Sequence, residues 1–121
     1  MHRIQTFNAI SELGLERFPN QQYEVGAEIK EADAILLRSH KLDANVIDGQ
    51  LKAVARAGAG VNNVPVDECT EHGVVVFNTP GANANAVKEL VLCGLLLASR
   101  GIIPGIGFAS NQTGISDYGE L

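Results

Sequence analysis

Five short runs of mostly apolar residues alternate, over the first 78 residues, with segments of helical spacing, and this alternation restricts the fold more than any other feature. The predicted strands are residues 3–8, 23–26, 34–39, 51–57 and 74–78, and the predicted helices between them are residues 11–18, 27–32, 44–49 and 64–73. Strands that alternate with helices form parallel sheets with right-handed crossovers. The uninterrupted apolar letters "AILL" and "VVVF" are typical of strands covered on both faces. The sequence therefore predicts an α/β, doubly wound fold: a parallel five-stranded sheet with helices on both faces.

The pattern changes at residue 83, where a long C-terminal helix is predicted. Residues 83–101 contain an Asn at either possible first position, a run of good helix formers, and Gly101 just past the end. This helix is apolar around its whole circumference, so it needs cover from a second domain or a second subunit. The residues after it hold so many glycines, with Pro104, that no regular element is predicted there. We expect residues 1–82 to form one domain and residues 83–121 to form the linking helix and the start of another.

Composition excludes several classes of function. The 121 residues are 45% hydrophobic and 19% charged, as in one globular domain, and no run approaches the roughly 20 apolar residues of a membrane span. A net charge of −5 without any run of Lys or Arg argues against nucleic acid or an acidic membrane as a partner. The first residues lack the apolar core of a secretion signal, so we expect a cytoplasmic protein. Cys69 and Cys93 are far apart and have no histidine at ligand spacing, so buried thiols are expected and no metal site.

Ligands of doubly wound sheets bind beyond the carboxyl ends of the strands, and four loops there are chemically suggestive. They read "NAIS" (8–11), "RSHK" (38–41), "RAGAGVNN" (56–63) and "NTPGANAN" (78–85). In the third, Gly58 and Gly60 allow a ligand close to the backbone and permit unusual dihedral angles, while Arg56 offers paired donors for carboxylate or phosphate. Arg38 and Ser39 supply a second set of donors. These loops predict a small-anion site; the alternative is that both arginines pair with surface acids such as Asp33 or Asp67.

A glycine loop after a strand can also bind a dinucleotide, but two positions in this sequence argue against such a site. Asn63 stands where the third glycine of GxGxxG is needed, and Asn78 stands where an acidic residue would bind a ribose. Farther along, Asn83 and Asn85 both precede the long helix. Only one of them is needed as its cap, so the other is available to a ligand.

Together these segments resemble the D-isomer-specific 2-hydroxyacid dehydrogenases. The resemblance runs through residues 56–90, "RAGAGVNNVPVDECTEHGVVVFNTPGANANAVKEL", and through "ILLRSHKLDANVI" at 35–47. It implies a flavodoxin-like substrate-binding domain, to which an NAD-binding domain is added in the family. Within the family the wording is most similar to members that oxidise 3-phospho-D-glycerate to 3-phosphohydroxypyruvate in serine biosynthesis. Here Ala59, Asn62 and Pro65 depart from the wording of many relatives.

The resemblance also implies roles for particular residues. Side chains that hold the phosphate and carboxylate of 3-phosphoglycerate would be Arg38, Ser39, Arg56 and Asn83. Backbone from Gly58 to Gly60 would lie near substrate, and Ala59 would lie beside the nicotinamide of NAD. Acid and base residues of the reaction fall in the family's second domain, so this chain alone is expected to be inactive, and a homodimer or larger assembly is expected for the full enzyme. The alternative is a stand-alone flavodoxin-like module that binds a small phosphorylated or carboxylic acid without catalysis.

Overall fold

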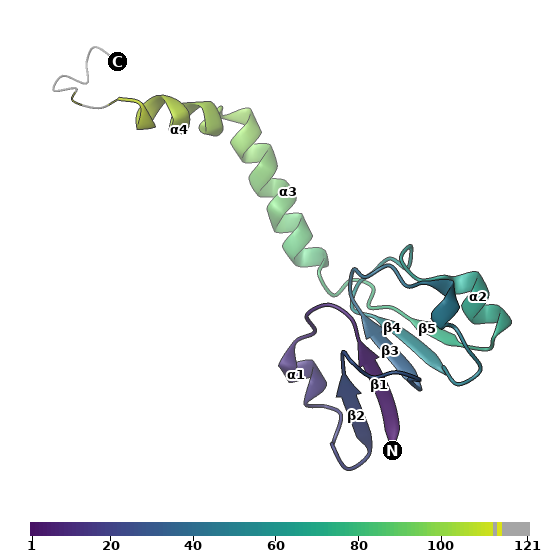
Figure 1. Ribbon diagram of the computed structural model, residues 1–121. Coiled ribbons are helices and arrows are strands. Elements are labelled where there is room, and N and C mark those ends of the chain that lie inside the picture. The colour runs from purple at the N-terminus through teal and green to yellow at the C-terminus, as the bar shows by residue number, and fades with distance from the viewer. Residues whose placement is uncertain (113, 115–121) are drawn as a thin grey trace. The chain divides into compact units, whose positions relative to one another are not determined.

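A computed structural model describes residues 1–112 and 114 (Figure 1). The chain divides into two units, Met1–Asn83 and Ala84–Leu121. The first contains the sheet, and the described part of the second contains two helices. The expected assignment of residues 83–121 to a further domain stays a prediction, and residues 113 and 115–121, which it includes, lie outside the described residues.

All five predicted strands are present and parallel. They are β1 (His2–Thr6), β2 (Tyr23–Gly26), β3 (Ala34–Leu37), β4 (Ala53–Arg56) and β5 (Val75–Phe77). Their order in the sheet is β2-β1-β3-β4-β5, with Ile4 of β1 opposite both Val25 and Ala34. This is the flavodoxin-like order, in which the direction of winding reverses between β1 and β3. The α/β fold class predicted from the sequence is confirmed.

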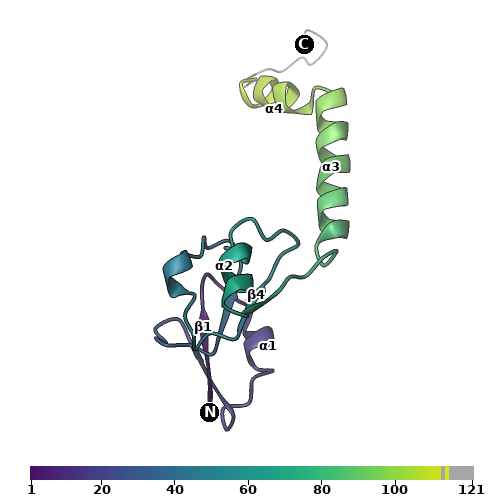
Figure 2. The same ribbon diagram turned by 90° about the vertical axis from the view of Figure 1, so that its right-hand side faces the viewer.

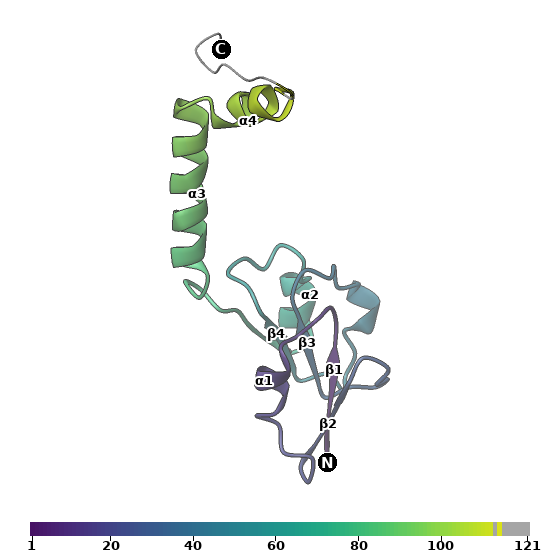
Figure 3. The same cartoon turned by 90° about the vertical axis from the view of Figure 1, so that its left-hand side faces the viewer.

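Helical connections lie on both faces of the sheet because right-handed crossovers change face when the winding reverses. They are α1 (Glu12–Leu15), the 3₁₀ helix η1 (Ala44–Val46) and α2 (Val66–Glu71). Figures 2 and 3 show α1 and η1 on opposite sides of the sheet.

The helix predicted at 27–32 is wrong. This segment is a non-helical connection in which Glu31 has a φ of 53°. Its carbonyls accept side-chain hydrogen bonds instead, Ala27 from Gln5 and Glu31 from Arg3 and Gln50, while Ile29 is buried. A left-handed residue interrupts the helical spacing, and side chains from other segments satisfy the backbone.

The core lies on the face of the sheet that η1 and α2 cover. Ile35, Leu37 and Val54 of the central strands pack there with Cys69 of α2. The rest of this cluster comes from connecting segments: Leu42, Ile47, Leu51, Val64 and Val74. On the other face Ile4 is buried, but Val75 and Phe77 of the edge strand β5 are 48% and 56% exposed. The single turn of α1 is too short to cover that face.

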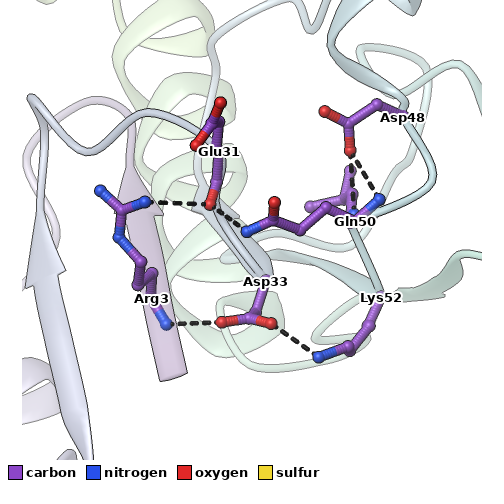
Figure 4. A network of polar contacts seen from close by, with 7 residues as sticks. Arg3, Glu31, Asp33, Asp48, Gln50 and Lys52 are labelled. Carbon is purple, nitrogen blue, oxygen red and sulfur yellow. Dashed lines mark hydrogen bonds and ion pairs between the residues drawn. The ribbon is translucent and has the colours of Figure 1, made fainter. Parts of the chain in front are cut away.

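A polar network ties together the amino-terminal ends of β1, β3 and β4 (Figure 4). The carboxylate of Asp33 accepts the backbone N–H of Arg3 at 2.9 Å and pairs with the Lys52 ammonium at 2.6 Å. Asp48 accepts the backbone N–H groups of Gln50 and Leu51, both at 3.0 Å. The Lys52 hydrogen bond, helped by that of Arg3, lowers the pKa of Asp33. These contacts fix strand register at the edge of the sheet opposite the candidate site.

The second unit contains α3 (Ala84–Ser99) and α4 (Ile102–Ser110). Gly101, with a φ of 59°, ends the first helix as predicted and precedes the second. The absence of an element after residue 101 was predicted wrongly, because Pro104 falls in the first turn of α4, where its missing N–H costs nothing. No residue of α3 is buried, so the expectation of a buried thiol is confirmed for Cys69 but wrong for Cys93, which lies on this helix. Among described helices none is alone long and apolar enough to cross a membrane; α3 and α4 meet that criterion only together, across a 63° bend.

Candidate functional site

Four loops meet at the carboxyl-terminal edge of the sheet, and hydrogen bonds join them to one another. The loop after β1 is bonded to the loop after β3 through Asn8, whose side-chain oxygen accepts backbone N–H groups of residues 38–40. The loop after β4 reaches the same segment through Asn63. The loop after β5 holds the glycine loop through Asn78 and Thr79. The four loops that the sequence analysis identified as chemically suggestive therefore form one continuous surface.

In the glycine loop, residues 57–63, the carbonyls of residues 58–60 are hydrogen-bonded, whereas the N–H groups of residues 59 and 60 have no acceptor among the described residues. The carbonyl of Gly58 accepts the N–H of Thr79 at 3.0 Å, that of Ala59 accepts the Asn78 amide at 2.7 Å, and that of Gly60 accepts Arg56. The N–H groups of Ala59 and Gly60 donate no hydrogen bond within residues 1–112 and 114. A loop with engaged carbonyls and free N–H groups presents positive dipole ends, which suits an anion.

The side chain of Arg56, the last residue of β4, lies against the backbone of this loop. Its Nε donates to the carbonyl of Arg38 at 3.0 Å and its Nη1 donates to the carbonyl of Gly60. A Cβ built on Gly58 would lie 3.2 Å from the guanidinium carbon, and one on Gly60 would lie 3.0 Å from Nη1. Both glycines have ordinary φ angles, so the expectation that they adopt unusual dihedrals is wrong; their lack of a side chain makes room for Arg56. Its predicted role as an anion ligand stays a prediction.

Arg38 and Ser39 come directly after β3 and are exposed. Neither side chain makes a hydrogen bond or ion pair with any other residue that the structure describes, so both are available to a ligand. Pairing of the arginines with Asp33 or Asp67 is not observed in the described part of the chain, where Asp33 pairs with Lys52.

Asn83 and Asn85 lie at the start of α3. Asn85 is occupied along the helix: its amide donates to Glu89 at 2.8 Å and its oxygen accepts Lys88 at 2.6 Å. Asn83 is the last residue of the first unit and is exposed. Its predicted contact with substrate stays a prediction.

The sequence missed Asn8, Asn63 and Asn78 as site-building residues. Asn63 donates to the carbonyls of Arg38 at 3.2 Å and His40 at 2.7 Å, and its own oxygen is buried without a partner among the described residues. Asn63 and Asn78 had served only as evidence against a dinucleotide site. The sequence did carry a signal, because asparagine side chains that follow parallel strands are suited to hydrogen-bond the backbone of the loops.

The described residues do not form a complete dinucleotide site. Asn63 fills the position of the third glycine, and its amide is committed to the backbone of residues 38 and 40. Asn78, where an acidic residue would bind ribose, is bonded to Ala59. The following helix α2 has six residues and begins only at Val66. The surface therefore suits a small anion that contacts exposed side chains and free amides.

This fold defines a flavodoxin-like α/β domain, in which the carboxyl ends of the strands form the candidate ligand-binding surface. The family model "D-isomer specific 2-hydroxyacid dehydrogenase, catalytic domain" matches residues 2–117, and the chain belongs to this family.

Similar proteins include the D-3-phosphoglycerate dehydrogenase of Mycobacterium tuberculosis (strain H37Rv), 48% identical over 79 residues that make up 63% of this chain and 15% of the relative. The hydroxypyruvate reductase of Thermotoga maritima is 45% identical over 73 residues, 58% of this chain and 24% of the relative. The solved NAD⁺-bound 3-phosphoglycerate dehydrogenase of Entamoeba histolytica matches with a TM-score of 0.67 and 28% identity, over 79% of this chain and 38% of that one. The matches thus span between 15% and 38% of these relatives.

Proposed function

We propose that this chain is the substrate-binding part of an NAD-dependent D-3-phosphoglycerate dehydrogenase, which oxidises 3-phospho-D-glycerate to 3-phosphohydroxypyruvate in the first step of serine biosynthesis. The observation that supports it most is the 48% identity to the M. tuberculosis enzyme of that name. The geometry is compatible, since available Arg38 and Ser39 side chains and free amides of the glycine loop occupy the same edge of the sheet.

In this proposal the residues of this chain recognise the substrate. Arg38 pairs with its phosphate or carboxylate, because a guanidinium can donate two parallel hydrogen bonds to either group. Ser39, Asn83 and the N–H groups of Ala59 and Gly60 complete the binding surface. Arg56 holds the glycine loop in shape and has donors left over for the anion.

NAD, when bound, supplies the hydride acceptor for C2 of the hydroxy acid. Because the described residues do not form a dinucleotide site, we place most of its binding in parts of the protein outside this chain, with Ala59 beside the nicotinamide. The acid and base are placed there too, so the 121-residue chain alone is proposed to be inactive. The complete enzyme is proposed to be a cytoplasmic homodimer or larger assembly without nucleic-acid or membrane partners.

A second candidate substrate is an unphosphorylated hydroxy acid, favoured by the 45% identity to the hydroxypyruvate reductase of T. maritima. The two candidates differ in the phosphate group. Affinity for matched acids with and without phosphate therefore separates them.

The test is a titration of the chain with 3-phosphoglycerate and with D-glycerate, followed through backbone amide NMR shifts. We expect 3-phosphoglycerate to shift residues 38–40 and 58–60, and Arg38→Gln to weaken it at least about tenfold, since a charged hydrogen bond contributes about 1.5–3 kcal/mol. Arg17→Gln, which changes the same charge at another exposed arginine, is the matched control. Equal affinity for D-glycerate would favour the second candidate, and binding of neither acid would refute both.

A further inference from the structure

Asn8 has an unusual backbone and an unusual set of partners. Its φ of 67° makes it, with Glu31, one of two non-glycine residues with positive φ among those described. Asn is one of the residues that accept this conformation at lowest cost. In it, the side-chain oxygen accepts the N–H of Ser39 at 2.9 Å, that of His40 at 2.8 Å, and that of Arg38 at a longer 3.4 Å. Three successive N–H groups thus converge on one amide oxygen.

The carbonyls of the same segment, residues 38–40, are held from the other side. Arg56 and Asn63 both donate to the carbonyl of Arg38, and Asn63 also donates to that of His40. The ring of Phe7 stacks on His40, with centroids 4.3 Å apart and planes 9° from parallel. The loops after β1 and β4 therefore fix the backbone of this segment.

The segment contributes little to its own anchoring. Within the described residues, the Arg38 and Ser39 side chains have no hydrogen-bonding partner, while five of the six backbone polar groups of residues 38–40 have one. A backbone that is fixed by other segments, with its own polar side chains left available, is a preorganised binding element, because its ordering cost falls on folding and not on binding.

We propose that Asn8 is a positioning residue of the anion site: it fixes the backbone from which Arg38 and Ser39 reach the ligand, without contacting the ligand itself. The ligand's identity rests on the proposed function, whereas the ordering of residues 38–40 does not. A neutral amide suits this role because it accepts the three N–H groups without adding negative charge beside an anion site.

The first measurement is amide hydrogen exchange of residues 38–40 in the whole chain without ligand. Asn8→Gly keeps access to positive φ and removes the acceptor, whereas Asn8→Asp keeps an acceptor oxygen in the same place by replacing the amide with a carboxylate. We expect the Ser39 and His40 amides to exchange at least about tenfold faster in Asn8→Gly and to return to within about twofold of the native rate in Asn8→Asp. Unchanged exchange in Asn8→Gly would overturn the proposal.

The matched control is Glu31→Gly, at the other residue of positive φ, whose side chain is exposed. It should leave the exchange of residues 38–40 as in the native chain. Should Asn8→Gly fail to fold, Asn8→Ser replaces it, since the shorter hydroxyl cannot span the same three N–H groups.

The second measurement is the affinity for 3-phosphoglycerate, which should fall at least about tenfold in Asn8→Gly. Asn8→Asp serves only the exchange measurement, because its added negative charge beside the site would itself weaken an anion. Loss of affinity in Asn8→Gly with native exchange of residues 38–40 would contradict a positioning role. If the native chain binds no acid at all, the proposed function fails, and the exchange rates still decide whether Asn8 orders the segment.

Discussion

Gly60→Ala tests whether the glycine loop is shaped around Arg56. The new methyl group would lie 3.0 Å from Nη1 of Arg56 and 3.3 Å from the side-chain oxygen of Asn62, so the guanidinium must move. The displaced guanidinium loses its hydrogen bond to the carbonyl of Gly60, which for a charged donor costs about 1.5–3 kcal/mol, whereas the stiffer unfolded chain returns about 0.4–1 kcal/mol. The difference is a net decrease of about 1 kcal/mol in the free energy of unfolding. For a domain of this size, that lowers Tm by roughly 4–8 °C.

The assay is thermal unfolding of four chains in a double-mutant cycle: the native chain, Gly60→Ala, Arg56→Met and the double variant. In the Arg56→Met background the obstructing guanidinium is gone, so Gly60→Ala should leave Tm unchanged or raise it. Gly49→Ala is the matched control, because a Cβ there meets nothing within 4 Å and only the unfolded-state gain remains. An equal loss of Tm from Gly60→Ala in both backgrounds would refute the reasoning.

Two further predictions concern the opposite edge of the sheet and the thiols. The hydrogen bond from Lys52 lowers the pKa of Asp33, so the ionised carboxylate stabilises the fold above the carboxyl's unfolded pKa, and this stabilisation is lost as pH falls through the lower folded pKa. Asp33→Asn should therefore reduce Tm at pH 7 but not in strong acid. The reduction at pH 7 should be larger than that from Glu24→Gln, which removes the ion pair with Arg3. Cys93 is exposed whereas burial raises the pKa of Cys69, so a thiol reagent should label Cys93 in the folded chain and Cys69 only on unfolding, a result contradicted by equal labelling rates.

The central strands β3 and β4 were predictable because both carry apolar residues into the core. Ile35, Leu37 and Val54 lie in the core, and "AILL" alone indicates a strand covered on both faces. The segment at 27–32 was mispredicted because its conformation is decided by Arg3 and Gln50, which lie far from it in sequence and donate to its backbone.

The meeting of the four loops at one edge of the sheet was predictable, but the hydrogen bonds among them were not. The topology brings Arg38 and the glycine loop to one edge, and sequence order suffices to predict that. What it could not predict is that Arg56 bonds the backbone of its own loop, or that Asn8 meets residues some thirty positions later. Such contacts depend on the rotamers and loop paths of the folded chain, which leave no periodic signal in the sequence.

The order of the strands has a consequence for synthesis on the ribosome. β1 is made first yet lies inside the sheet, with β2 and β3 on either side. Asn8, at its end, must wait for residues 38–40, and the glycine loop must wait for Asn78 and Thr79 before its carbonyls are satisfied. Non-local contacts of this kind form only after the intervening chain has closed. The candidate anion site is therefore completed only after β5 has left the ribosome, and a nascent chain that stops before β5 has a sheet without the finished set of loops.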